Sequence, residues 1–206
     1  MWPELAHHHL VSESPDRLRP TQISVGLAEV AAKRRGWVTL SKKERRETLE
    51  REVFPAVRGP KEKYYIIDHH HLGLALIEEN VAEVLLAVHD DLSWLSEDVF
   101  WRTMEFRAWA HPFDERGRRC QFSQIPRRLT DLKDDPYRSL AGDVRRAGGY
   151  AKSIAPFAEF LWADFFRPVI AMGTVKNNTK RAVNEGVKLA RSAQARYLPG
   201  WSGAHE

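Results

Sequence analysis

Residues 64–77, Tyr-Tyr-Ile-Ile-Asp-His-His-His-Leu-Gly-Leu-Ala-Leu-Ile, restrict the possible folds of this chain more than any other stretch. The first four residues are aromatic or β-branched, which is typical of a β-strand. From Leu72 onward, Ala75 and Leu76 recur at the three- and four-residue spacing of one helix face. We therefore predict a strand at 64–67 that passes through an elbow at 68–71 into a helix.

The elbow gathers groups suited to binding an anion. Asp68 falls near the N-terminus of the predicted helix, where its carboxylate can accept from free backbone N–H groups. The same helix end offers donors and a partial positive charge to a phosphate. His69, His70 and His71 add imidazoles that titrate near neutral pH and ligate metals when neutral. The alternative is a capped helix start with surface histidines.

Three consecutive side chains cannot all face one ligand, because neighbouring residues project in different directions in a strand and in a helix. If the elbow is extended, His69 and His71 share a face and can bind one metal ion together. A further ligand would then come from elsewhere in the chain, the candidates being Glu29, His111 and Asp114. If the helix has begun, one histidine faces the anion and the others pack or meet solvent.

The rest of the chain predicts a mixed architecture. An alternating segment around residues 21–25 leads into a helix that carries Glu29, and a capping box at Ser41 and Glu44 starts a second helix. Residues 53–58 are predicted as a short strand with an edge position for Pro55. Residues 82–89 are predicted as a buried strand, and Ser96 begins a further helix.

These elements predict an α+β fold with a small mixed sheet, flanking helices and a helical C-terminal region packed on it. Residues 1–16 lack periodicity and are predicted to be a loose arm, and residues 17–125 form the core. Residues 126–206 form the helical extension, with helices expected after Pro136, at 156–166 and at 178–197. The helix at 156–166 carries too much apolar surface to remain in water, so we expect it to pack on the core.

Composition excludes several classes of protein. Cys120 is the only cysteine among 206 residues, so the chain has no internal disulfide, no Cys-rich zinc site and no paired-thiol redox motif. No apolar run approaches the length of a membrane span, and the N-terminus lacks a signal-peptide profile, so we expect a cytoplasmic protein that does not enter a membrane. The net charge of +4 permits phosphate-bearing partners without requiring them.

Two segments together resemble a known superfamily. Residues 18–23, Leu-Arg-Pro-Thr-Gln-Ile, lead into a helix, and about forty-five residues later 66–71, Ile-Ile-Asp-His-His-His, lead into another. This arrangement is similar to the ParB/sulfiredoxin superfamily, in particular its ParB-like nuclease branch. The likeness covers about residues 17–90, and residues 135–166 also look like the helical tail of that branch.

The resemblance implies that 68–71 is the phosphate-handling segment. In chromosome-partitioning ParB this segment has a glycine where His69 stands and paired arginines where His70 and His71 stand, which argues against a CTP-gated clamp. Sulfiredoxins need a cysteine in this motif, and none of residues 68–71 is cysteine. Free-serine kinases of the superfamily match at Asp68 and His71 but not at His69 and Leu72.

These observations give one main functional hypothesis: a protein that binds or acts on a phosphate-containing ligand, a nucleotide or nucleic acid, by phosphoryl transfer or phosphodiester hydrolysis. The cofactors we expect are a nucleotide and a divalent metal, Mg²⁺ or Mn²⁺. The candidate catalytic residues are Asp68, His70, His71 and Glu29; the candidate phosphate or substrate ligands are Thr21, Gln22, His69 and Arg138; the candidate metal ligands are Asp68, His69 and His71.

The alternative is a module without catalysis that binds nucleotide, DNA or a protein partner. Its DNA contact would be the basic helix predicted over 178–196. No helix-turn-helix pattern is evident, which counts against sequence-specific reading of DNA.

Overall fold

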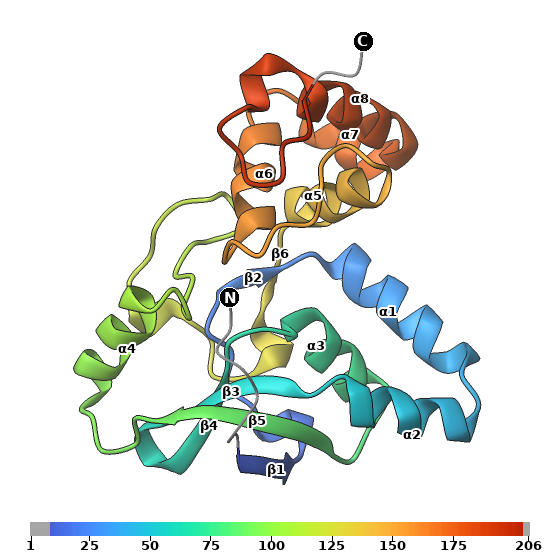
Figure 1. Ribbon diagram of the computed structural model, residues 1–206. Helices are drawn as coiled ribbons and strands as arrows, with labels where there is room; N and C mark the ends of the chain where they lie inside the picture. Colours follow the sequence, from blue (N-terminus) through green and yellow to red (C-terminus); the bar gives the residue numbers. More distant parts are fainter. Residues whose placement is uncertain (1–8, 204–206) are drawn as a thin grey trace.

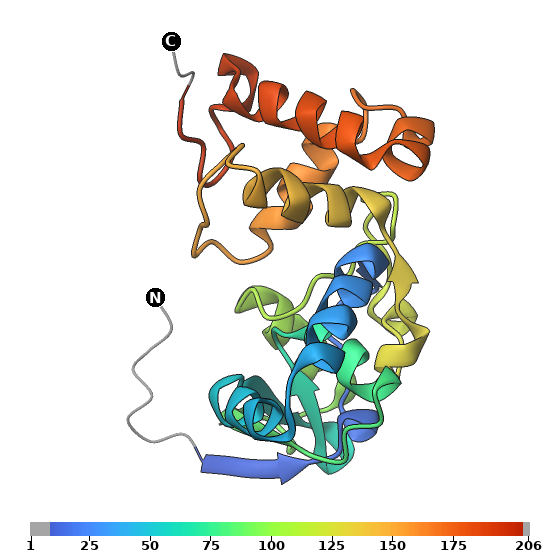
Figure 2. The ribbon, with the colours of Figure 1, turned by 90° about the vertical axis from the view of Figure 1, so that its right-hand side faces the viewer.

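The fold was obtained as a computed structural model that describes residues 9–203. Figure 1 shows a lower layer, made of a sheet with helices around it, and an upper layer made of the C-terminal helices. Figure 2 shows the same two layers from the side, with the C-terminal helices lying over the core. The predicted α+β fold with a helical C-terminal region packed on it is confirmed.

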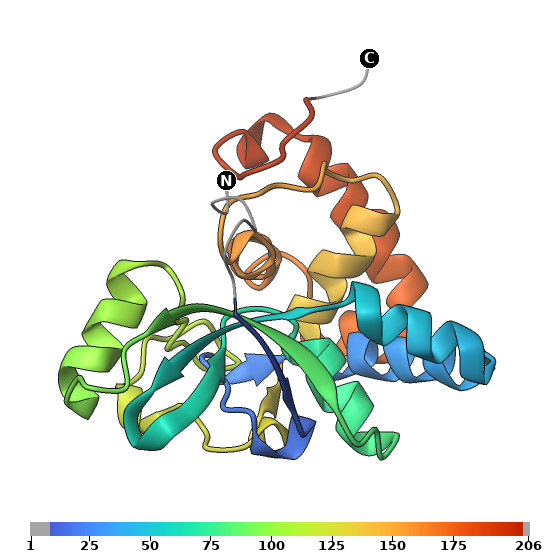
Figure 3. The same ribbon diagram turned by 60° about the horizontal axis from the view of Figure 1, so that its bottom comes forward.

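The main sheet has four strands in the order β1-β5-β3-β4. Their bounds are β1 His9–Glu13, β3 Phe54–Gly59, β4 Lys63–Ile66 and β5 Val84–Asp91. β5 pairs antiparallel with β1 and parallel with β3, and β3 pairs antiparallel with β4, so the sheet is mixed. Figure 3 shows the strands fanning out, with α4 on one side and α1 and α2 on the other.

Two expectations about strands need correction. Residues 9–13 belong to the predicted loose arm but form the edge strand β1, because their backbone pairs with β5 from His9↔Val88 to Glu13↔Val84; residues 1–8 lie outside the described part. Pro55 is not on an edge strand, since β3 lies between β5 and β4. It is tolerated near the start of β3, where the ladder with β4 begins only at Ala56.

The helices of the core follow the predicted pattern closely. They are α1 (Leu27–Thr39), α2 (Lys42–Arg51), α3 (His70–Glu78) and α4 (Glu97–Phe106). Ser41 and Glu44 form the predicted capping box at the start of α2. The segment expected as a strand around 21–25 is regular only at β2 (Ser24–Val25), which pairs parallel with β6 (Lys133–Asp134). Short 3₁₀ turns complete the described chain at Pro15–Arg17, Pro60–Glu62, Phe122–Gln124, Leu129–Asp131 and Ala193–Ala195.

The C-terminal layer has its own buried core. Its helices are α5 (Pro136–Arg146), α6 (Ala158–Phe166), α7 (Met172–Asn177) and α8 (Thr179–Arg191). Trp162, Phe166 and Ile170 are fully or almost fully buried in it. Residues 126–134, which we assigned to this extension, lie with the core instead: Leu129 and Leu132 pack against the sheet cluster. No described helix has the length and apolar character needed to cross a membrane.

Candidate functional site

The elbow adopts the predicted strand-to-helix geometry. β4 ends at Ile66, and α3 begins at His70. His69 stands at the N-cap in the left-handed conformation (φ 65°), and no side chain caps the helix. The first-turn N–H groups of α3 therefore have no intrahelical acceptor, as expected for an anion site at a helix start. Asp68 precedes the cap, and its Oδ1 accepts from the His69 N–H at 2.6 Å.

His70 and His71 connect α3 to the segment that leads into α1. The Thr21 N–H donates to His70 Nε2 at 3.1 Å, and the Gly26 N–H donates to His71 Nε2 at 3.0 Å. Both imidazoles are buried. An imidazole nitrogen that accepts from a backbone amide is unprotonated, so these contacts require neutral rings. Through these two hydrogen bonds, both rings hold the elbow against residues 21–26.

Burial sets the protonation of these rings. It lowers the pKa of His70 to about 3, aided by the neighbouring histidines and opposed by Asp68. It also holds the pKa of His71 well below its ordinary value, and the Arg138 guanidinium adds to the effect. The expectation that these two histidines titrate near neutral pH is therefore wrong, because a buried charged imidazole would lose its hydration.

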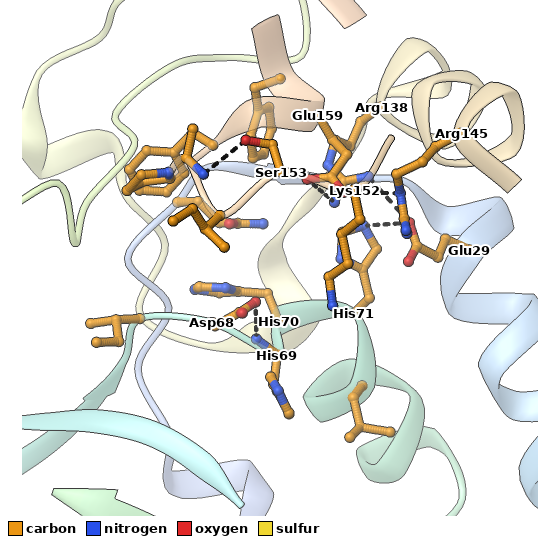
Figure 4. A pocket seen from close by; sticks show the side chains of 18 of the residues that line it. Glu29, Asp68, His69, His70, His71, Arg138, Arg145, Lys152, Ser153 and Glu159 are labelled. Carbon is orange, nitrogen blue, oxygen red and sulfur yellow. Dashed lines mark hydrogen bonds and ion pairs between the residues drawn. The ribbon is translucent and has the colours of Figure 1, made fainter. Parts of the chain in front are cut away.

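His69 points differently from its neighbours. Its ring meets the edge of Phe54 at a centroid distance of 5.3 Å, and burial lowers its pKa. Figure 4 shows it turned away from the labelled side chains above the elbow. The left-handed φ favours glycine, which ParB has at the corresponding place by resemblance, and a non-glycine residue there costs about 1 kcal/mol.

A cavity of about 490 Å³ opens above the elbow, between the core and the C-terminal layer. Its floor is the elbow itself, and α1 contributes Glu29 and Lys33. Its roof comes from α5, α6 and the segment that joins them. The roof includes Arg138, Arg145, Lys152, Phe157 and Glu159, most of them labelled in Figure 4. The volume is that of an ordinary small-ligand site.

One ion pair on the cavity wall joins the two layers: Arg138 Nη1 of α5 lies 3.2 Å from Glu29 Oε2 of α1. A second pair lies within the C-terminal layer, where Arg145 Nε is 3.3 Å from Glu159 Oε1. His71 Nε2 is 3.7 Å from the same Glu29 oxygen. Glu29 and Arg138, predicted from segments more than a hundred residues apart, thus meet at the cavity.

Two lysines at the cavity, unlike the arginines, have no carboxylate partner in the part of the chain that the structure describes. Lys33 of α1 and Lys152 of the joining segment both line it, and neither forms an ion pair with any described residue. An amine with no carboxylate partner remains available to a phosphate. The two lysines add amines to a lining whose carboxylates are Glu29, Glu52, Asp68 and Glu159.

The other predicted site residues fall into two groups. Gln22 lines the cavity, although its Nε2 donates to the Ser24 carbonyl at 2.8 Å. Thr21 is fully buried and does not line it; its Oγ1 donates to the Ile66 carbonyl at 2.8 Å, so it holds the elbow in place.

The structure does not assemble the predicted metal ligands. Because α3 has already begun at His70, His69 and His71 do not share a face, and no three His, Cys, Asp or Glu side chains converge within residues 9–203 to hold a metal ion. His111 is stacked on Phe113 and Phe157 instead, and its ring is tilted against that of Phe160. Asp114 accepts from the backbone of its own turn and from Arg118.

Sequence reasoning missed most of the roof. Lys33, Arg145, Lys152 and Glu159 carry no local motif, and three of them lie some eighty residues or more beyond the elbow. Only the packing of α1, α5 and α6 around the elbow brings them to it. This mixed set of cations and one acid could have been inferred only from the tertiary arrangement.

Comparison with known proteins identifies a family and similar solved structures. A family model described as "Putative ParB-like nuclease" matches residues 11–168. The crystal structure of protein Atu1540 from Agrobacterium tumefaciens is similar over 96% of this chain and 100% of that chain, with 46% sequence identity and a TM-score of 0.88. A search of curated proteins gave no match. The matched segment contains the elbow and all the cavity residues named above.

Proposed function

Because this chain belongs to the ParB-like nuclease family, we propose that its cavity binds the phosphates of a nucleotide or of a nucleic-acid strand and catalyses phosphoryl transfer or phosphodiester hydrolysis. One observation carries the proposal: the uncapped N-terminus of α3 opens into a cavity of about 490 Å³ that also holds the unpaired amines of Lys33 and Lys152. Helix-end amides and lysines together are a common way to hold phosphate oxygens.

The contacts suggest distinct roles for the elbow residues. The backbone N–H groups of 70–72 hold the anion, while His70 and His71 stay neutral and fix the elbow through Thr21 and Gly26. Proton transfer in the reaction is then the role of a carboxylate. Asp68 is exposed at the helix start and can accept the proton of an attacking water or hydroxyl group.

Glu29 suits an electrostatic role better than proton transfer. Its carboxylate is only 16% exposed and lies against Arg138, which holds it in one orientation. Arg138 in turn lies over the ring of Phe160 at 5.4 Å. This arrangement orients the guanidinium toward the cavity, where it can meet the charge that develops on a transferred phosphoryl group.

A divalent ion fits this proposal only if the substrate phosphates supply some of its ligands. The described residues offer no cage of three ligands, but Mg²⁺ is commonly bound by one or two carboxylates together with substrate phosphates. Asp68 is the carboxylate we propose for that contact. The ion would neutralise phosphate charge.

The test compares binding and turnover in matched variants. Titration calorimetry with nucleoside triphosphates and Mg²⁺ is run on wild type, Lys152→Ala and the control Lys42→Ala, which removes an exposed lysine from α2 outside the cavity. We expect Lys152→Ala to weaken binding by roughly tenfold, the effect of removing one charge-assisted hydrogen bond, and Lys42→Ala to bind as wild type does.

Turnover is followed separately with triphosphates and with plasmid DNA. Asp68→Asn should lose turnover, because the amide cannot accept a proton and is a poorer ligand for Mg²⁺, but should keep nucleotide binding when this is measured without the metal. Binding without turnover in wild type would instead identify a non-catalytic module. No binding of any nucleotide or nucleic acid to the cavity would overturn the proposal.

A further inference from the structure

The charge of this chain is distributed very unevenly. Basic and acidic residues are equal in number over residues 1–169, so the whole formal charge of +4 is carried by residues 170–206. Within the described part of that stretch Glu185 is the only acidic residue. This excess lies in α7, α8 and the turn after them, beyond the family match, which ends at residue 168.

The packing of α8 determines where these charges point. Ala182, Gly186 and Ala190 form its buried stripe against the C-terminal core. An added Cβ at Gly186 would lie 2.5 Å from Val144 Cγ2, so α8 lies very close to α5. Small residues on one side hold the helix rigidly and fix the direction of the opposite side.

The opposite side of α8 is a basic ridge, by which we mean Lys180, Arg181 and Lys188. All three are exposed, and they lie on the helix face opposite the small-residue stripe. None of them forms an ion pair with a described residue, whereas surface arginines of the core, such as Arg58 and Arg118, pair with nearby carboxylates. Figure 2 shows α8 along the outer edge of the C-terminal layer, away from the sheet.

We propose that the basic ridge of α8 binds the phosphate backbone of a nucleic-acid duplex, at a surface separate from the cavity. A rigid helix spaces Lys180 and Lys188 by about 12 Å along its axis, and a duplex presents about one negative charge per 1.7 Å of its own axis. Contacts of this kind position a protein on DNA without reading its sequence, which agrees with the absence of a helix-turn-helix pattern.

Two other anionic partners fit the ridge less well. Helices that bind membrane surfaces carry large apolar residues beside their basic face, and α8 exposes no large apolar side chain. Sites for single strands interleave cations with aromatic rings on which bases stack, and α8 contains no aromatic residue. A duplex backbone needs only the linear array of charge that the ridge supplies.

The test measures binding of a labelled DNA duplex, about two helical turns long, by fluorescence anisotropy over a series of salt concentrations. The variant is Lys180→Gln with Lys188→Gln, since glutamine keeps the helix propensity and removes both charges. The control is Lys42→Gln with Lys43→Gln on α2, which removes equal charge from an exposed helix of the core.

We expect wild type and the control to bind the duplex with the same salt dependence. In the α8 variant the slope of log K against log salt should fall in magnitude by about 2, close to 0.9 for each phosphate that the helix no longer neutralises. An unchanged slope in the α8 variant, or no duplex binding by wild type at low salt, would overturn the proposal.

Two parallel measurements identify the partner. Vesicles containing phosphatidylserine and a single strand of equal length are tested at the same salt concentrations; preference for either over the duplex would also overturn it. Nucleotide binding in the cavity should be the same in wild type and in the α8 variant. The proposal for the ridge and the proposal for the cavity can therefore be refuted independently of each other.

Discussion

Among single residues, His70 and His71 hold the site in place from within. Each accepts one backbone N–H from the segment that leads into α1, at 3.1 Å and 3.0 Å. A buried amide without an acceptor is costly, so these two hydrogen bonds fix the approach of α3 to α1. The elbow can then present its own free amides to the cavity in one orientation.

The first prediction concerns His71. His71→Leu should lower the free energy of unfolding by about 1–3 kcal/mol, because it leaves the buried Gly26 N–H unpaired. His71→Gln should lower it much less, since the glutamine oxygen can take the place of Nε2. Chemical denaturation monitored by circular dichroism measures both. Equal losses in the two variants would show that packing of the ring, not the hydrogen bond, is what matters.

The second prediction is a pH dependence with a definite sign. The folded protein keeps His70 neutral down to a pKa of about 3, whereas in the unfolded chain the imidazole takes up a proton below its ordinary pKa of 6.5. The free energy of unfolding should therefore fall as pH drops from about 6.5 toward 3, by up to about 1.4 kcal/mol per pH unit for each such imidazole.

Other groups titrate in the same range, so the measurement is a difference. Denaturation of wild type and of the double variant His70→Gln with His71→Gln is compared at several pH values between 7 and 4. The carboxylates contribute alike to both proteins. The double variant should lose stability less steeply; parallel curves would contradict the assignment of this slope to the two histidines.

Among the helices and strands, the close crossing of α1 and α5 shapes the cavity. A Cβ added at Gly26, just before α1, would lie 2.3 Å from Ser139 Oγ and 2.8 Å from the Ser139 backbone nitrogen. Only glycine allows this approach, which brings Glu29 of α1 to Arg138 of α5. The wall of the cavity thus depends on a residue that does not line it.

The third prediction uses two glycines close together in the chain. Gly26→Ala should destabilise the protein by about 1–3 kcal/mol and weaken nucleotide binding, because α5 must move away from α1. Gly36→Ala is the control: a Cβ there meets nothing within 4 Å, and alanine inside a helix should raise the free energy of unfolding by about 1 kcal/mol. Thermal unfolding and titration calorimetry measure the two effects. If Gly26→Ala changed neither the free energy of unfolding nor nucleotide binding, α5 would be only loosely packed on α1.

Across the whole molecule, the C-terminal layer completes the site and depends on the core. Arg138 reaches Glu29, and the rings of Phe157 and Phe160 pack against His111 of the core. These contacts join the two layers over the cavity. Asp135, at the start of α5, pairs with Arg167 at 3.0 Å, and its side chain is only 1% exposed, so the first turn of the roof is itself firmly held.

The fourth prediction is that the core does not survive alone. Truncation after Asp134 removes the partners of Glu29 and His111 and leaves the apolar surface around them in water, so the fragment should aggregate or unfold without cooperativity. Size-exclusion chromatography and a thermal melt measure this. A soluble fragment with a sharp transition would show that the two layers fold independently and meet only afterwards.

Local patterns in the sequence were enough to predict most of the elements and the position of the elbow, but they missed β1 and α7. Apolar spacing at 64–67 and after Leu72 predicted β4 and α3, because these periods are local properties of the chain. The capping box at Ser41 and the Asp135-Pro136 helix start were likewise predictable, since their hydrogen bonds span only a few residues. Family resemblance then pointed to residues 68–71 as the phosphate segment.

Packing between distant segments sets what those residues do. No local pattern shows that His70 and His71 are buried against residues 21–26, and burial is what lowers their pKa and turns apparent acid–base groups into neutral acceptors. Nor could spacing foretell that Arg138, Arg145 and Lys152 would form the roof of the cavity, because contacts between distant segments depend on how helices pack. The sequence by itself located the elbow at 68–71 that forms the floor of the cavity. The packing of α1, α5 and α6 around that elbow determined which charged side chains line the rest of it.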